Sequence, residues 1–169
     1  MINNDFNLAN LSFQQGDIYT LKQNFLGDCD GIISLQTLSW LPDFQEPLAA
    51  MMEINPDFIA LSSLFFEGDI STTTQVLEHK RSRSTFYNTY SIPQVESFVR
   101  SYGYHIERLE PFEIDVDLPK SKDVDFMSTY TINVNEQASR KVKRLQFSGP
   151  LLLNWYFLMI KRGSFNRQS

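Results

Sequence analysis

The chain has 169 residues, of which 42% are hydrophobic and 14% aromatic, and its formal net charge is −5. This composition excludes an intrinsically disordered chain, and the length fits one domain that spans residues 1–169. The acidic balance disfavours nucleic acid as a partner, because phosphate backbones are bound by clustered basic side chains. The one basic cluster, HKRSR at residues 79–83, is short, and such runs are usually solvated loops or helix faces.

Three features of the sequence bear on the cellular compartment. Cys29 is the only cysteine, which excludes a disulfide within the chain and fits a reducing compartment. The first residues, MINNDFNLAN, lack the basic start and apolar core of a secretory signal. The longest apolar run, GPLLLNWYFLMI, is interrupted by Asn154 and is shorter than the ~20 residues that span a bilayer. We therefore expect a cytoplasmic protein that does not enter the membrane.

The first half of the chain predicts three strands. Residues 11–15 (LSFQQ) are a short predicted strand that breaks at Gly16 and Asp17, two residues that favour turns. The segments DGIISLQ and DFIALSSLFF predict strands at Gly31–Leu35 and at residues 58–64. Their apolar residues are nearly continuous, which is typical of strands buried on both faces of a parallel sheet.

Capping signals predict two helices. Asp43 and Glu46 have the spacing of a capping box at the start of DFQEPLAAMMEI. Ser91 and Gln94 have the same spacing at the start of the next helix, and Gly103 is placed to end it. The predicted buried stripe of this second helix consists of Ile92, Val95, Phe98, Val99 and Tyr102.

The remaining segments have other patterns. Residues 67–90 are polar and aromatic without a clear period, which predicts a long excursion over the end of the sheet, with some helix. Residues 112–118 alternate between apolar and acidic residues, as in a strand with one wet face. Residues 130–134 and 142–147 predict a hairpin, and residues 152–160 predict a last strand. The order of elements predicts an α/β sheet that ends in antiparallel strands.

A series of five motifs covers most of the chain from about Leu11 onward: GDIYTL, DGIISLQTLSWLPD, PDFIALSS, YSIPQVESFVRSYGY and WYFLMIKR. In order and approximate spacing, this series resembles the later strands of class I S-adenosylmethionine-dependent methyltransferases. The resemblance implies a Rossmann-like sheet, mostly parallel with antiparallel terminal strands, and S-adenosylmethionine as the cofactor. It implies no metal.

The sequence departs from that family at its amino-terminal end. Members of the family begin with a strand, a glycine-rich G-x-G-x-G loop, a helix and a second strand, and nothing before Asp17 resembles these. The resemblance therefore implies a truncated domain that lacks the first strands, or a cofactor half supplied by another chain. In the family's strand order the absent strands lie beside Gly31–Leu35. This strand is expected to pair with residues 11–15 or to have an unpaired edge that binds a second copy or a partner chain.

The resemblance assigns cofactor contacts to two places. Asp17, in the GD turn, would bind the adenine amino group, with Ile18 packed against the ring. The alternative for Asp17 is an ordinary turn residue. Leu35 and Gln36, at the end of an apolar strand, would also contact the cofactor. Gln36 is equally well explained as a polar residue at the start of a helix.

The same resemblance places the acceptor near five further residues. Trp40 lies where relatives often carry a ring facing the transferred methyl group, and the alternative is a packed aromatic residue. Tyr87 and Tyr90 lie in the segment expected to cover the substrate. His79 and Glu67 are candidates for a base that takes a proton from an oxygen or nitrogen acceptor. The alternative for His79 is an exposed residue in a charged loop.

Two functions follow from these observations. The first is a methyltransferase that acts on a small molecule or a sugar-type metabolite, because the chain has no basic surface for nucleic acid. The second is a catalytically inactive fragment that serves as a binding or assembly module. A generic nucleotide-binding protein is disfavoured, because the sequence contains neither G-x-x-x-x-G-K-[ST] nor G-x-G-x-x-G.

Overall fold

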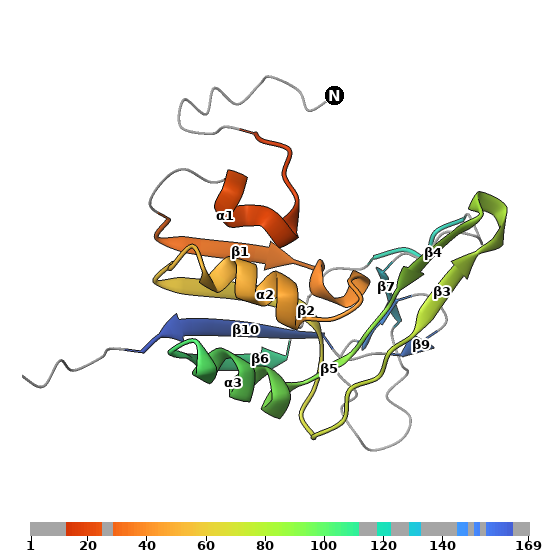
Figure 1. The fold of residues 1–169 in the computed structure, drawn as a ribbon. Coiled ribbons are helices and arrows are strands. Elements are labelled where there is room, and N and C mark those ends of the chain that lie inside the picture. Colours follow the sequence, from red (N-terminus) through yellow and green to blue (C-terminus); the bar gives the residue numbers. More distant parts are fainter. Residues whose placement is uncertain are drawn as a thin grey trace, which may run out of the picture.

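The computed structural model describes residues 13–24, 29–111, 118–122, 129–132, 145–148, 151–152 and 155–163. Its centre is an open sheet whose strands lie in the order β1 (Gly31–Leu35), β2 (Phe58–Phe66), β10 (Trp155–Arg162) and β6 (Tyr104–Pro111) (Figure 1). A fifth strand, β5 (Tyr90–Ser91), pairs with the end of β2. Because helices follow strands along the chain and pack on the sheet, the fold is α/β.

The strand directions divide this sheet into two parts. β1 runs parallel to β2, with Ile33 opposite Ala60. β10 is antiparallel to both of its neighbours, β2 and β6, so β6 runs in the same direction as β2. The register between β10 and β6 shifts between Met159 and Ile160. The predicted α/β sheet that combines parallel and antiparallel strands is therefore confirmed.

The two longer helices pack on the same face of the sheet. α2 (Gln45–Met52) follows β1 in the chain and α3 (Ile92–Ser101) follows β5, and Figure 1 shows both in front of the strands. Most of their buried residues belong to one apolar cluster with Leu61 of β2 and Leu158 of β10, which are both 0% exposed. Burying a leucine side chain contributes about 1.5–3 kcal/mol, so this layer is a main source of the stability of the fold.

The predicted start of α3 at Ser91 is confirmed, whereas α2 begins at Gln45 with Phe44 as its cap residue, one position after the predicted Asp43. Asp43 Oδ1 accepts a hydrogen bond from the Glu46 N–H at 3.1 Å. Ser91 Oγ accepts one from the Gln94 N–H at 3.3 Å. Gln94 does not complete a capping box, because its Nε2 donates to Asp69 Oδ1 instead. Local hydrogen bonds of this kind explain why both helices begin at or next to the position that the sequence predicts.

The end of α3 agrees with the prediction except at one residue. Gly103 has φ of 80°, a left-handed conformation that glycine adopts readily, and it follows the end of the helix. Ile92, Val95 and Val99 of the predicted stripe are buried. Tyr102 is 44% exposed, so its predicted burial is wrong. Tyr102 comes directly after the last helical residue, so its backbone is no longer helical and its side chain does not continue the buried stripe.

Two predictions about strands are wrong. Residues 13–15, the described part of the first predicted strand, form no strand, and Phe13 is 79% exposed. Among the described strands β1 pairs only with β2, so residues 13–15 do not occupy its outer edge as predicted. β2 is buried on both faces over residues 59–65, as predicted. β1 is not, because it is an edge strand whose Ile33 and Leu35 are 68% and 63% exposed.

A hairpin takes the place of the irregular excursion predicted between β2 and α3. β3 (Gln75–Glu78) pairs antiparallel with β4 (Arg83–Phe86), and the short helix η3 (His79–Arg81) joins them. Ser82 adopts φ of 49° where the chain turns back. Figure 1 shows this hairpin reaching away from the main sheet. The sequence did not predict this hairpin because each arm has only four residues of alternating pattern and the connecting segment is a run of basic residues.

The one predicted hairpin is confirmed. β7 (Thr129–Ile132) pairs antiparallel with β8 (Leu145–Ser148), which also pairs with β9 (Leu151–Leu152). Tyr130 lies opposite Phe147, so these two residues of the predicted arms are paired. The predictions for residues 112–117, 133–134 and 142–144, and for residues 11–12 of the first strand, lie outside the described residues.

Candidate functional site

The carboxyl ends of β1 and β2 form the candidate site. In open α/β sheets, ligands bind beyond the carboxyl ends of the parallel strands. Gln36 follows β1 directly, and its N–H lies 2.7 Å from the Ser62 carbonyl oxygen of β2. Its φ of 58° is a left-handed conformation that is uncommon outside glycine. The predicted cofactor residues Leu35 and Gln36 therefore lie at a sharp turn at the end of the sheet, with both side chains exposed.

A short helix after this turn positions Trp40. The helix is η2 (Leu38–Trp40), and the Ser39 N–H attaches it to Ser63 Oγ of β2 at 3.1 Å. The ring centroids of Trp40 and Tyr87 are 4.9 Å apart, with the planes tilted by 60°. Tyr87 is 1% exposed, whereas Trp40 is only partly buried. Two predicted substrate residues are thus in contact, and Trp40 is the one with accessible surface.

A buried polar network holds the loop after η2. Asn88 Nδ2 donates to the carbonyl oxygens of Leu41 at 2.9 Å and Pro42 at 3.1 Å. The Tyr90 hydroxyl donates to the same Leu41 oxygen at 3.0 Å. Burial raises the pKa of Tyr90, so its hydroxyl stays a hydrogen-bond donor. Tyr90, a predicted substrate residue, uses its hydroxyl inside the protein, and Asn88 was not predicted at all.

Glu67, one of the two candidate bases, lies just beyond β2. Its carboxylate accepts a hydrogen bond from the hydroxyl of Tyr156 at 3.0 Å. Tyr156 belongs to β10 and is buried, while Glu67 is exposed. The neighbouring strand therefore fixes one oxygen of an accessible carboxylate at the end of the sheet.

His79, the other candidate base, lies at the tip of the β3–β4 hairpin. It is exposed, as the alternative reading of a charged loop expects. An open hollow of about 290 Å³ at this tip is lined by Leu77, Glu78, His79, Ser82, Arg83 and Ser84. Hydrogen bonds from Arg83 and Arg81 lower the pKa of Glu78. The structure does not bring His79 to Glu67, since the hairpin reaches away from the sheet (Figure 1).

Asp17 and Ile18 lie at the start of η1 (Ile18–Thr20), before α1 (Leu21–Asn24). Asp17 Oδ1 accepts a hydrogen bond from the Tyr19 N–H at 3.0 Å, and the rest of its side chain is exposed. Ile18 packs against the main apolar cluster. Asp17 is therefore both a helix cap and an accessible carboxylate.

A second group of carboxylates lies near Asp17, and the sequence did not predict it. Burial raises the pKa of Tyr19, and the negative charges of Asp43, Glu46 and Asp17 raise it further. η1 packs against α2, which brings its Asp17 toward the acidic start of that helix. The only signal in the sequence was that Asp17 and Asp43 each stand at the start of a helical segment. That signal does not show that η1 and α2 pack against each other. Concentrated negative charge favours ligands that carry positive charge or N–H donors.

No protein-family model matches the sequence, and no curated protein matches it. Within the described ranges, no group of three or more His, Cys, Asp or Glu side chains could hold a metal ion. No helix in the part of the chain that the structure describes is long and apolar enough to cross a membrane. The site geometry and the order of the motifs are therefore the basis for a functional assignment.

Proposed function

We propose that the chain is a class I S-adenosylmethionine-dependent methyltransferase domain that acts on a small-molecule or sugar-type acceptor in the cytoplasm. The observation that supports this proposal best is the sheet itself. Two parallel strands, β1 and β2, precede a last strand, β10, that runs in the opposite direction, as the motif series implies. The chain's net charge of −5 supports a small acceptor over nucleic acid.

The proposed cofactor contacts fit the charges of the site. The exposed carboxylate of Asp17, with Asp43 near it, suits the N–H donors of an adenine amino group. Leu35 and Gln36, at the turn after β1, are proposed to contact the methionine end. Of the three predicted substrate residues, Trp40 is proposed to border the substrate, whereas Tyr87 and Tyr90 are buried and are proposed to hold this part of the site in place. The first presents accessible surface, and the other two support it from within.

Bound S-adenosylmethionine would supply an activated methyl group: an oxygen or nitrogen of the acceptor would bond to the methyl carbon while the bond from that carbon to sulfur breaks and the neutral thioether leaves. Glu67 is the better placed of the two candidate bases, because Tyr156 orients it at the end of β2. Its free oxygen would take the proton that the acceptor loses. His79 would serve only if the hairpin folded over the sheet, so it is the weaker candidate.

The second candidate function is an assembly module without catalytic activity. The observation that favours it is the outer edge of β1, where Ile33 and Leu35 are exposed. Such a module would bind another chain through this edge and present the carboxyl end of the sheet to it.

Calorimetric titration with S-adenosylmethionine tests the methyltransferase proposal. Asp17→Ala should weaken binding by roughly 1–3 kcal/mol, the cost of leaving a polar group of the ligand without its partner. Asp17→Asn should also weaken binding but retain the cap of η1, which separates charge from helix stability. Asp30→Ala is the matched control, because Asp30 is exposed before the opposite end of β1.

Two outcomes would count against the proposal. Equal affinities of the native and Asp17→Ala chains would remove Asp17 from the cofactor site. A native chain that binds no cofactor at millimolar concentration would leave the assembly module as the better supported function.

A further inference from the structure

The backbone of β1 points alternately toward β2 and away from it. The N–H of Gln36, directly after β1, donates to the Ser62 carbonyl oxygen and therefore points toward β2. Alternate residues of a strand turn their N–H and C=O groups to the same side. Gly31, Ile33 and Leu35 therefore direct these groups to the outer edge of the sheet.

Within the described part of the chain, the middle of this outer edge has no hydrogen-bond partner. The Gly31 carbonyl oxygen accepts from Cys29 Sγ at 3.1 Å, and the Leu35 carbonyl oxygen accepts from Thr37 Oγ1 at 3.2 Å. The N–H and C=O of Ile33 bond to none of the described residues. The two ends of the edge are locally capped, and its centre is open.

The side chains at this edge are apolar and exposed. Ile33 and Leu35 are 68% and 63% exposed, whereas Ile32 packs against the main cluster on the side of the helices. Residues 31–37, GIISLQT, include no charged residue and no proline. Natural edge strands usually carry charges, proline or bulges that prevent pairing with another chain. β1 has none of these protections.

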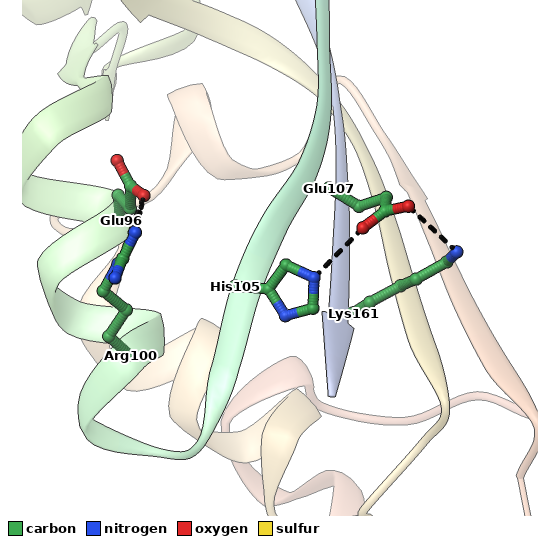
Figure 2. Close-up of polar contacts among 5 residues, drawn as sticks. All are labelled: Glu96, Arg100, His105, Glu107 and Lys161. Carbon is green, nitrogen blue, oxygen red and sulfur yellow. Dashed lines mark hydrogen bonds and ion pairs between the residues drawn. The ribbon is translucent and has the colours of Figure 1, made fainter. Parts of the chain in front are cut away.

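The opposite edge of the same sheet is protected. On β6, Glu107 bonds to His105 at 3.1 Å and to Lys161 of β10 at 3.4 Å, and Figure 2 shows these side chains on the side of β6 away from α3. Arg108 and Glu110 form a further ion pair at 2.7 Å. The register shift in the pairing with β10 adds an irregularity. Among the described strands, the sheet therefore has one protected edge and one open edge.

We propose that β1 pairs antiparallel with β1 of a second copy of the chain, around a two-fold axis at Ile33. This inference rests on the second candidate function, the assembly module, and names its partner; it does not depend on methyl transfer. A two-fold contact brings a surface against its own copy. A charged edge would then repel itself, whereas residues 31–37 are neutral in a chain of net charge −5.

The shape of the edge fits this register. With Ile33 on the axis, each Ile33 faces its copy, and Leu35 faces Gly31 of the second copy. The ring of Phe58 fills the space next to Gly31, since a Cβ there would lie 2.2 Å from Phe58 Cζ. Leu35 of one chain would thus pack beside Phe58 of the other. Because the β6 edges are protected, pairing ends at a dimer and does not continue into a fibre.

Light scattering and amide hydrogen exchange on the full chain test the proposal together. The native chain at roughly 100 µM should have twice the mass of one chain if the dissociation constant is micromolar. The Ile33 amide should exchange slowly in the dimer and faster on dilution, because its acceptor is the Ile33 carbonyl oxygen of the second copy. I33K should raise the dissociation constant at least about tenfold, because two like charges then lie directly opposite.

Matched variants separate this edge from other surfaces. I70K changes an isoleucine that is 62% exposed outside β1, and it should leave the dimer intact. A mixture of I33K and I33E chains should form the dimer again, since opposite charges then face each other across the axis. A monomeric native chain, a dimer with a rapidly exchanging Ile33 amide, or an I33K chain that still dimerises would each overturn the proposal. If I33K fails to fold, the exchange rate of the Ile33 amide in the native chain, and its dependence on dilution, decides between dimer pairing and an open edge. Cofactor titration of the native chain tests the methyltransferase proposal by a different measurement, so either proposal can fail while the other stands.

Discussion

Replacing Asn88 by alanine is expected to destabilise the fold and to loosen the loop after η2. Asn88 is 0% exposed, and its side chain connects two segments. Its Nδ2 donates to Leu41 and Pro42 at 2.9 and 3.1 Å, and its Oδ1 accepts from the Thr74 N–H at 3.0 Å. The substitution removes these three bonds and a fourth, from Asn88 Nδ2 to the Tyr90 hydroxyl at 3.1 Å. Because the loop follows Trp40 directly, the change also affects the candidate site.

The size of the effect depends on which groups lose their only partner. The Leu41 carbonyl oxygen keeps the Tyr90 hydroxyl at 3.0 Å. Pro42 is exposed, so water can replace the amide there. The Thr74 N–H is partly buried and loses its acceptor. Leaving such a donor unsatisfied costs about 1–3 kcal/mol, and the lost packing adds about 1 kcal/mol, so we expect about 2–4 kcal/mol in total.

Urea unfolding followed by tryptophan fluorescence measures this cost. Tyr90→Phe is the matched comparison, and it should cost only about 1 kcal/mol, because Leu41 then keeps its bond from Asn88. A loss below about 0.5 kcal/mol for Asn88→Ala, with an unchanged dependence on urea, would contradict this role of the Asn88 side chain. It would mean that other contacts position the loop.

Three further changes test individual features of the structure. Gln36→Gly should raise the free energy of unfolding by about 0.5–1 kcal/mol, because glycine relieves the left-handed strain at φ of 58°; a decrease in urea unfolding experiments would show that the glutamine side chain contributes more than the strain costs. Gly31→Ala should lower stability by about 1–3 kcal/mol through its clash with Phe58, and Phe58→Ala in the same chain should remove that penalty. The hydrogen bond with His105 is the largest cause of the lowered pKa of Glu107, so His105→Ala should raise this pKa toward its ordinary value, as NMR of the carboxyl group would show. Because the pKa is lower in the folded chain, the ion pair stabilises the fold above the unfolded-state pKa. This small stabilisation is lost as the pH falls through the folded-state pKa.

Features that depend on neighbours in the sequence were predictable. Asp43 and Ser91 cap their helices because the backbone N–H groups they accept from lie three residues away. The second hairpin was predictable for a similar reason, since its alternating residues pair Tyr130 with Phe147. Such contacts need only the correct local conformation, and the sequence determines that directly.

Features that depend on neighbours in space were not predictable. The runs GIISL and FIALSSL both predict strands buried on two faces, and this holds only for the second. β2 has a strand on each side, whereas β1 lies at the edge of the described sheet, and no pattern within five residues determines that position. The approach of Asp17 to Asp43 is of the same kind, because it requires η1 to pack against α2.

The two proposals meet at β1. The strand is five residues long; Ile33 carries the open backbone groups at its centre, and Gln36 begins the turn toward the candidate cofactor site immediately after its end. Pairing at Ile33 would restrict the backbone as far as Gln36, because one short strand connects them. A chain that dimerises would therefore present Leu35 and Gln36 in a more fixed geometry, and a ligand bound there would favour the dimer by the same factor. If both proposals hold, S-adenosylmethionine should tighten the association and I33K should weaken cofactor binding, although residue 33 is not among the proposed cofactor contacts.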